Sequence, residues 1–374
     1  MDPVTQGALG ASLPQSLARR SDMALAALAG MLAGMAPDLD VLIRSSEDPL
    51  LFLEYHRQFT HSLFFIPFGA DIVAGLLWLL FGRRRRWDFL QLYAFCFLGY
   101  ATHALLDACT TYGTQLLWPF TSRRFAWNNV SVIDPLVTLP LLLLVAVSLR
   151  TGRARYARIA FLWVVTYLSL GVLARDAAQE LGRAVAARRG HAPVAVEAKP
   201  SFANILLWKT VYLEGDRYYV DALRLGVEPR LYPGDSVAAL DLDRDFPWLR
   251  RTSLQANDVE RFRWFSMGYL ARDPKYPERI MDLRFSLLPD EIRPLWSIEL
   301  DPRAQDDRHV RYVTDRRAGA AQWGRLWAML RGAGGVALDD YAAPTRHATD
   351  RQTTQAASLQ QASAASSADP PSTR

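Results

Sequence analysis

Three short stretches of the N-terminal half of the sequence each contain two histidine or aspartate residues. The stretches are APDLDVL with Asp38 and Asp40, YHRQFTHS with His56 and His61, and ATHALLDACT with His103 and Asp107. Imidazole and carboxylate ligands without a thiolate suit zinc, manganese or iron acting as a Lewis acid. We therefore predict a site for one or two divalent ions, with zinc favoured, that activates water for hydrolysis.

The spacing of these residues restricts how they can meet. His103 and Asp107 are four residues apart, so on a helix both side chains project from one face. His56 and His61 are five apart, about 140° around an ideal helix, and can share a site only if their segment is a loop or turn. Asp38 and Asp40 also need non-helical backbone to share a site. Pro37 favours such backbone, because a proline disfavours the α conformation of the residue before it, here Ala36.

Two further side chains in YHRQFTHS, those of Arg57 and Thr60, are predicted to be catalytic. A guanidinium binds phosphate through two parallel hydrogen bonds, so Arg57 could hold an anionic group of a substrate. An arginine at a membrane edge, such as Arg57, Arg123 or Arg124, fits a headgroup-facing role equally well. Asp134, directly before Pro135, fits a helix N-cap at least as well as a ligand.

Apolar segments must position these residues. Segments of about 20 apolar residues, the length that spans a bilayer core, are predicted at 24–43, 62–81, 89–109, 132–149 and 158–174. Arginine clusters at 17–20, 82–87 and 150–158 flank them, and placing all three in the cytoplasm makes the five spans alternate. This topology predicts that the N-terminus lies inside and that everything after residue 174 lies outside.

Under this topology the polar stretches converge on the outer membrane face. Ionisable residues at membrane depth are costly and usually face the interior of a bundle or a water-filled cavity. The convergence of separate segments is the strongest indication of a site in the sequence.

The C-terminal half has a different pattern. Residues 176–190 predict an amphipathic helix, and from about 202 short β-like runs follow, including a hairpin across Glu214-Gly215-Asp216 and a strand in RFRWFSMGYL. GAAQWGRLWAMLRG predicts a closing helix. From about 343 the sequence is rich in Ala, Ser, Gln and Thr, which predicts a disordered tail.

The predicted fold is an α-helical multi-span membrane domain of about five spans, followed by a soluble α+β domain rich in antiparallel strands. The predicted domains are a membrane-embedded metal-binding domain at 1–175, an amphipathic helix and linker at 176–200, an exported α+β domain at 201–342 and the tail at 343–374. The net charge of +5 is explained by membrane topology, and nucleic-acid binding is not expected. With two cysteines, a disulfide framework is not expected either.

As a set, these motifs resemble the YdjM-like (DUF457) family of membrane-bound metal-dependent hydrolases. The matching stretches are MDPVTQGALGA, AGMAPDLDVL, YHRQFTHSL, GYATHALLDACTTYGTQLLWPF and WNNVSVIDP, within residues 1 to about 175. The family is distantly similar to zinc-dependent phospholipase C and P1 nuclease, which cleave phosphate esters. The resemblance implies that the metal-site residues are Asp38, Asp40, His56, His61, His103 and Asp107. Many members have a histidine where this sequence has Gln6, which puts an N-terminal ligand in doubt.

We therefore expect a bacterial inner-membrane hydrolase with a periplasmic C-terminal domain. Its expected substrate is a phosphate ester in a lipid or lipid-linked molecule, and membrane lipids are its expected partners. The alternative is a non-catalytic membrane scaffold with a structural metal site and a partner-binding exported domain. A transporter is disfavoured, because five spans without an evident inverted repeat are atypical of transporter folds.

Overall fold

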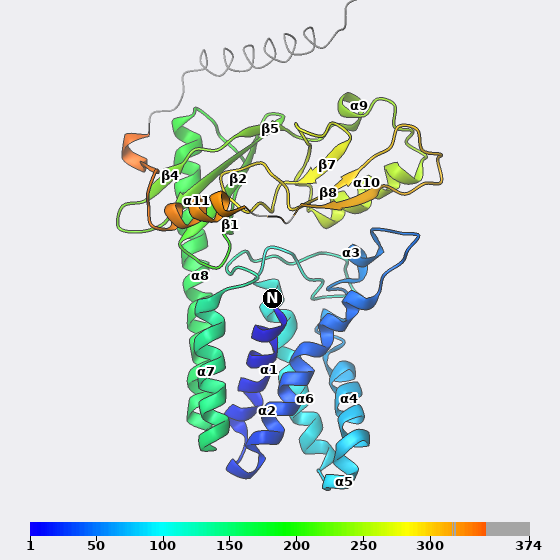
Figure 1. Cartoon of the computed structure of the whole chain (residues 1–374), viewed down its shortest axis with the longest axis vertical. Coiled ribbons are helices and arrows are strands. Elements are labelled where there is room, and N and C mark those ends of the chain that lie inside the picture. Colours follow the sequence, from blue (N-terminus) through cyan, green and yellow to red (C-terminus); the bar gives the residue numbers. More distant parts are fainter. Residues whose placement is uncertain (316, 318, 342–374) are drawn as a thin grey trace, which may run out of the picture.

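The computed structural model describes residues 1–315, 317 and 319–341, and the predicted tail at 343–374 lies outside them. Figure 1 shows a helical bundle and a β-rich domain stacked along the long axis of the molecule. We call the second part, residues 196–341, the C-terminal domain. This arrangement confirms the predicted fold class.

Six helices form the bundle. They are α1 (Pro3–Leu17), α2 (Met23–Met35), α4 (Ile66–Leu77), α6 (Phe89–Ala108), α7 (Pro135–Thr151) and α8 (Ala154–Arg188). Shorter helical elements are η1 (Arg20–Asp22), η2 (Ala36–Leu42), α3 (Leu51–Tyr55), η3 (Phe59–His61), η4 (Trp78–Gly82) and α5 (Arg83–Arg85).

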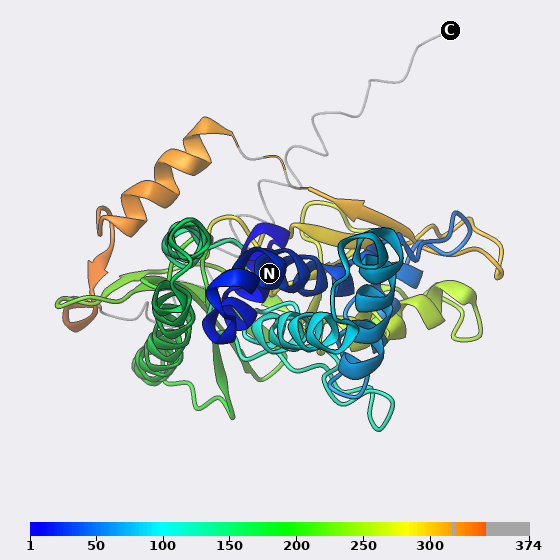
Figure 2. The ribbon, with the colours of Figure 1, turned by 90° about the horizontal axis from the view of Figure 1, so that it is seen from below.

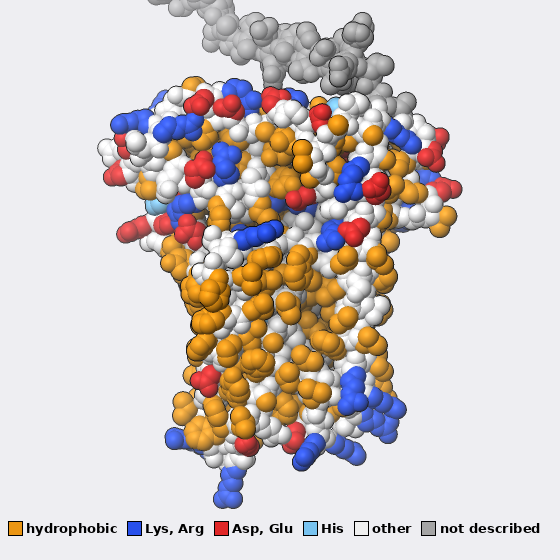
Figure 3. Space-filling view, turned by 180° about the vertical axis from the view of Figure 1, so that it is seen from behind, with side chains coloured by type: hydrophobic (Ala, Val, Ile, Leu, Met, Phe, Trp, Pro, Cys, Tyr) orange, Lys and Arg blue, Asp and Glu red, His pale blue; other side chains and the backbone are white. Residues whose placement is uncertain are grey.

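The bundle is a membrane-spanning unit. Four helical segments are long and apolar enough to cross a membrane: Arg20–Leu42, Ile66–Arg85, Phe89–Ala108 and Ala154–Arg188. The shorter α7 is a fifth apolar helix. Figure 3 shows apolar side chains over the visible face of the bundle, with Lys and Arg side chains at the end far from the C-terminal domain. The span count thus roughly matches the prediction.

The helix α1 is the main element that the sequence did not predict. Eleven of its 15 residues are buried, and it packs against α2, α6, α7 and α8, as the view from below in Figure 2 shows. A Cβ at Gly30 of α2 would overlap the carbonyl oxygen of Gly10 of α1, so the two backbones touch. Because α1 crosses the bundle, Met1 lies beside the C-terminal domain. The prediction that the N-terminus lies on the same side as Arg19 and Arg20 is therefore wrong.

The C-terminal domain contains two antiparallel sheets. The first has the order β1 (Val196–Pro200), β2 (Leu207–Glu214), β3 (Arg217–Arg224), β4 (Arg230–Tyr232) and β10 (Val336–Ala337), and β5 (Ser236–Ala238) also pairs with β3. The second has the order β6 (Leu270–Arg272), β7 (Arg279–Asp282), β8 (Trp296–Glu299) and β9 (Arg311–Thr314). Further helices are α9 (Leu242–Asp245), α10 (Leu254–Phe265), α11 (Ala320–Leu330) and η5 (Leu338–Asp340).

In the C-terminal domain, the predicted hairpin and closing helix are confirmed, and one predicted strand is wrong. The predicted hairpin is the β2–β3 pair, with Gly215 at a φ of +59° in its turn. The closing helix is α11. The strand predicted in RFRWFSMGYL is wrong, because the first half of this stretch is the end of α10 and only its last residue, Leu270, belongs to a strand, β6. Val259, Phe262 and Phe265 are buried at helical spacing, and the Ser253 side chain caps the helix start.

Helix α8 and a group of ion pairs near α3 help to fix the C-terminal domain to the bundle. The 35-residue helix α8 continues out of the bundle and packs against β1 and β2, so residues 176–188 extend a span rather than forming a separate helix. Near α3, Arg261 forms ion pairs with Asp48 and Glu54. Together these contacts hold the C-terminal domain over one end of the bundle.

Candidate metal centre

Three elements deliver four ligand groups to one point inside the bundle, near the C-terminal domain. Asp38 comes from η2, His61 from η3, and His103 and Asp107 from α6. One potential ligand atom from each lies within 4.8 Å of the others. The predicted convergence of the polar stretches is therefore found for these four residues.

Irregular backbone makes this convergence possible. The 3-10 helix η2, which begins at Ala36 directly after α2, turns Asp38 toward α6. Ala36 keeps helical φ and ψ angles of −61° and −38°, so the expectation that Pro37 moves it out of the α region is wrong. Arg57 has a φ of +65°, and the turn it makes between α3 and η3 brings His61 into the bundle. His103 and Asp107 share one face of α6, as their spacing predicted.

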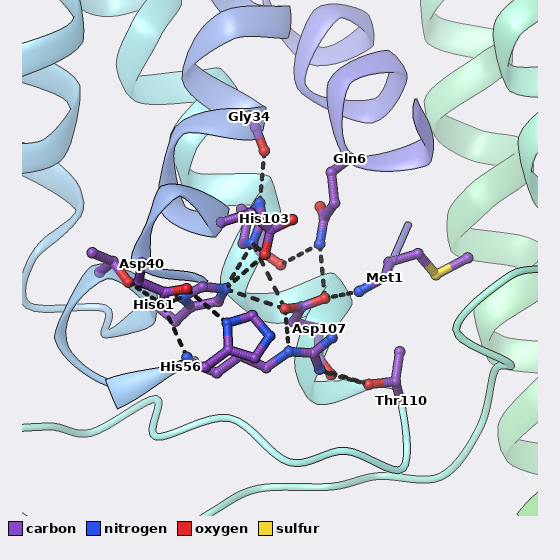
Figure 4. A network of polar contacts seen from close by, with 12 residues as sticks. Met1, Gln6, Gly34, Asp40, His56, His61, His103, Asp107 and Thr110 are labelled. Atoms are coloured by element: carbon purple, nitrogen blue, oxygen red, sulfur yellow. Dashed lines mark hydrogen bonds and ion pairs between the residues drawn. The ribbon is translucent and has the colours of Figure 1, made fainter. Parts of the chain in front are cut away.

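The two cluster imidazoles point their Nε2 atoms at each other (Figure 4). The Nδ1 atom of His103 lies 2.6 Å from the carbonyl oxygen of Gly34, and Nδ1 of His61 lies 3.1 Å from Asp40 Oδ2. Both neighbours are hydrogen-bond acceptors, so we assign the proton to Nδ1 in each ring. The two Nε2 lone pairs then face each other across 2.8 Å.

Carboxylate oxygens complete this electron-rich set. Asp107 Oδ2 lies 3.2 Å from His61 Nε2, and Asp38 Oδ1 lies 3.5 Å from His103 Nε2. Four electron-pair donors facing one another without a shared cation repel, whereas a single divalent ion would satisfy all four. These four side chains therefore fit a metal ion.

Asp40 and His56, also predicted as metal-site residues, lie beside the four-residue cluster. Asp40 Oδ1 lies 2.7 Å from His56 Nδ1, while its Oδ2 accepts hydrogen bonds from the Arg57 backbone N–H and from Thr60 Oγ1. Since Asp40 also contacts His61, it forms the carboxylate–histidine pair that commonly orients a metal ligand.

The carboxylate of Asp107 is held by several donors. The Gln6 amide donates to Oδ1 at 2.9 Å, and the Met1 amino group contacts the same oxygen. Arg57 Nε lies 2.9 Å from Oδ2, and its Nη1 donates to Thr110 Oγ1. The guanidinium that we predicted to hold a substrate anion is thus paired within the protein.

Asp134 is outside the site. Its side chain caps α7 at the backbone N–H of Leu136 and accepts a hydrogen bond from Tyr167. Of the two interpretations that the sequence left open, the structure supports the N-cap.

A supporting residue, Arg124, was not recognised as such from the sequence. It is buried and donates hydrogen bonds to the carbonyl oxygens of Leu53, His56 and Gly113. It therefore ties the loop after α6 to the segment that carries His56. The signal in the sequence was ambiguous, because a headgroup-facing arginine has the same flanking residues.

A cavity of about 850 Å³ connects the cluster to the C-terminal domain. Asp38, His56 and Arg57 line it from the bundle, and Lys199, Lys209 and Arg284 line it from the C-terminal domain. The side chains of Asp38 and His56 are 18% exposed, whereas His61, His103 and Asp107 are fully buried. Ligand access is therefore from the Asp38 side.

Comparisons with known proteins concern the bundle. Over 152 residues, 40% of this chain and 42% of the relative, the sequence is 30% identical to the uncharacterized protein YfhP of Bacillus subtilis. Over 109 residues, 28% of this chain and 60% of the relative, it is 35% identical to the inner membrane protein YbcI of Escherichia coli. The chain thus spans about half the length of these curated relatives.

No solved structure matches the chain, so the distant similarity to phospholipase C and P1 nuclease stays a prediction. The family model of the YdjM inner membrane proteins matches residues 1–178, which contain all four cluster residues. The membrane half of this chain is thus similar to the YdjM inner membrane proteins, which is the resemblance that its motifs predicted.

Proposed function

We propose that the protein is a metal-dependent hydrolase that cleaves a phosphate ester of a lipid or lipid-linked substrate at the periplasmic membrane face. One observation carries the proposal: four potential metal ligands converge, and the cluster is open to a large cavity on one side. A catalytic metal site keeps an open position, whereas a structural site is closed.

Asp38, His61, His103 and Asp107 are the proposed ligands. Their nitrogen and oxygen donors favour zinc, with manganese or iron as alternatives. A divalent ion held by these residues would supply Lewis acidity and would favour the ionised form of a water molecule at neutral pH.

Neighbouring residues have proposed supporting roles. Asp40 fixes the ring of His61 and keeps its Nε2 directed into the cluster. His56 lines the cavity and is paired through Nδ1 with Asp40, which leaves Nε2 to give a proton to a leaving group or to take one from water. Thr60 and Arg57 hold Asp40 and Asp107 in place and are positioning residues.

The position of the cavity supports a lipid substrate and periplasmic access. It lies at the junction of the apolar bundle with the C-terminal domain, and its lining includes the exposed apolar side chains of Val132 and Ile133. The exposed arginines at 83–86, at helix α5, lie at the other end of the bundle (Figure 1), which the positive-inside rule assigns to the cytoplasm.

The proposal is tested by hydrolysis of phosphatidic acid and p-nitrophenyl phosphate by the detergent-purified protein with added zinc. We expect release of inorganic phosphate that His103→Ala abolishes. The control variant is His191→Ala, which removes an imidazole outside the cluster, in the segment between α8 and β1, and it should keep full activity. Absence of phosphate release from both substrates by the zinc-loaded protein would contradict the hydrolase.

The alternative is a scaffold with a structural metal. In that case His103→Ala would lower the thermal stability of the protein. The natural protein and its variants would all lack hydrolase activity. Measuring the melting temperature beside activity separates the two functions.

A further inference from the structure

Two of the three lysines in the sequence are buried next to each other at the cavity. Lys199 of β1 is paired directly opposite Lys209 of β2, and their exposed fractions are 1% and 4%. Like charges directly opposite each other destabilise a sheet, and burying an ammonium group is costly unless it is paired. Packing of the domain alone therefore does not explain these lysines.

Lys209 has only uncharged hydrogen-bond partners. Its Nζ donates to Ser286 Oγ at 2.8 Å and to the backbone oxygen of Glu291 at 3.1 Å. The carboxylates nearby are paired with other cations: Glu197 with Lys199, Asp282 with Arg284, and Asp290 and Glu291 with Arg325. Within the described part of the chain, no ion pair involves Lys209.

Arg284 adds an unused donor to the same wall. It is 2% exposed, and its Nε and Nη2 bond to the carboxylate of Asp282. Its Nη1 is buried and lacks a hydrogen-bond partner among the residues that the structure describes. A buried donor without an acceptor is costly, so an acceptor entering the cavity would be favoured.

The remaining wall of the cavity is largely apolar. Its apolar lining includes Val132, Ile133, Phe202, Leu287, Leu295 and Trp323. The volume of about 850 Å³ is in the range of small-molecule sites. Cations, apolar surface and Asp38 of the four-residue cluster thus line one cavity.

We propose that Lys209 and Arg284 form an anion subsite for an amphiphilic ligand whose apolar part lies along the apolar wall. The inference rests on the proposed hydrolase and extends it. The substrate carries an anionic group, such as a second phosphate or a carboxylate, in addition to the ester that reacts near Asp38 and His56. Lys199, already paired with Glu197, contributes positive potential rather than a free donor.

The subsite is tested by isothermal titration of EDTA-treated protein in detergent. EDTA removes bound metal, so binding at the subsite is measured independently of the metal cluster. The two probes are inorganic phosphate and dioleoyl phosphatidic acid in mixed micelles. We expect phosphatidic acid to bind more tightly than inorganic phosphate, because only the lipid also covers the apolar wall.

Lys209→Met keeps the length of the side chain and removes the charge, and it should weaken binding of phosphatidic acid by about tenfold or more, the loss expected for a hydrogen bond to a charged group. Lys275→Met makes the same exchange at the exposed third lysine and should leave binding unchanged. Lys209→Arg restores a cation and should recover most of the affinity.

Three results would overturn the subsite: equal phosphatidic acid affinity in the natural protein and Lys209→Met, equal losses in Lys209→Met and Lys275→Met, or binding of inorganic phosphate alone. Failure of the hydrolase is a separate outcome. Lipid binding that depends on Lys209, with no phosphate release by the zinc-loaded protein, would retain the subsite and reject the catalysis.

Discussion

Replacing Asp40 with asparagine distinguishes a residue that orients a metal ligand from a ligand itself. The carboxylate of Asp40 lies 3.1 Å from His61 Nδ1 and 2.7 Å from His56 Nδ1, and it accepts hydrogen bonds from Arg57 and Thr60. Asparagine keeps one oxygen for some of these donors but loses the negative charge that faces His61. The four ligand groups of the cluster are unchanged.

The expected loss of metal affinity is that seen when a residue that hydrogen-bonds a metal ligand is replaced. Such exchanges typically lower metal affinity by about 10- to 100-fold, which corresponds to about 1.4–2.7 kcal/mol. Zinc affinity is measured by competition with a chromogenic chelator in detergent. Asp134→Asn is the matched control, because Asp134 is also a buried aspartate of the membrane half but caps α7 outside the cluster.

Two results would refute this reasoning. Complete loss of zinc binding in Asp40→Asn would place Asp40 in the coordination sphere, as the sequence first suggested. Equal affinities of Asp40→Asn and the natural protein would mean that His61 needs no orienting carboxylate.

Two further predictions concern stability. Burial lowers the pKa of Lys209 to about 7 from its usual 10.5. Between these two pH values the unfolded chain therefore binds more protons than the folded chain. The free energy of unfolding then rises with pH by up to about 1.4 kcal/mol per pH unit. Lys209→Met should therefore raise the melting temperature most at pH 7 or below, with a gain that shrinks toward pH 10; a gain independent of pH would contradict a buried charge. Gly30→Ala should destabilise by about 1–3 kcal/mol through overlap with Gly10, whereas Gly75→Ala, where a Cβ meets open space, should not; equal melting temperatures would contradict the close helix contact.

The bundle and its site were largely predictable because their signals are local. Apolar length identified the spans, and costly ionisable residues within them identified the site. Spacing also predicted the shared face of His103 and Asp107 and the turn between His56 and His61. Which of these residues meet at one point depended on the path of η2 and η3, which no local pattern specifies.

Other features depend on contacts between distant segments. The helix α1 is short, contains Pro14 and buries polar residues such as Gln6 and Gln15, so it lacks the uniform apolar character of a span. The juxtaposition of Lys199 and Lys209 follows from strand register, and their position at the metal-site cavity follows from docking of the C-terminal domain on the bundle. Neither can be read from nearby residues.

The metal centre is the central claim, and elemental mass spectrometry of the detergent-purified protein tests it most directly. The comparison is between the natural sequence and a His61→Ala, His103→Ala double variant, each exposed to zinc and manganese and then desalted. We predict at least one equivalent of metal in the natural protein and none in the double variant. Absence of metal from both proteins, or equal metal content in the two, would contradict a site built on these histidines.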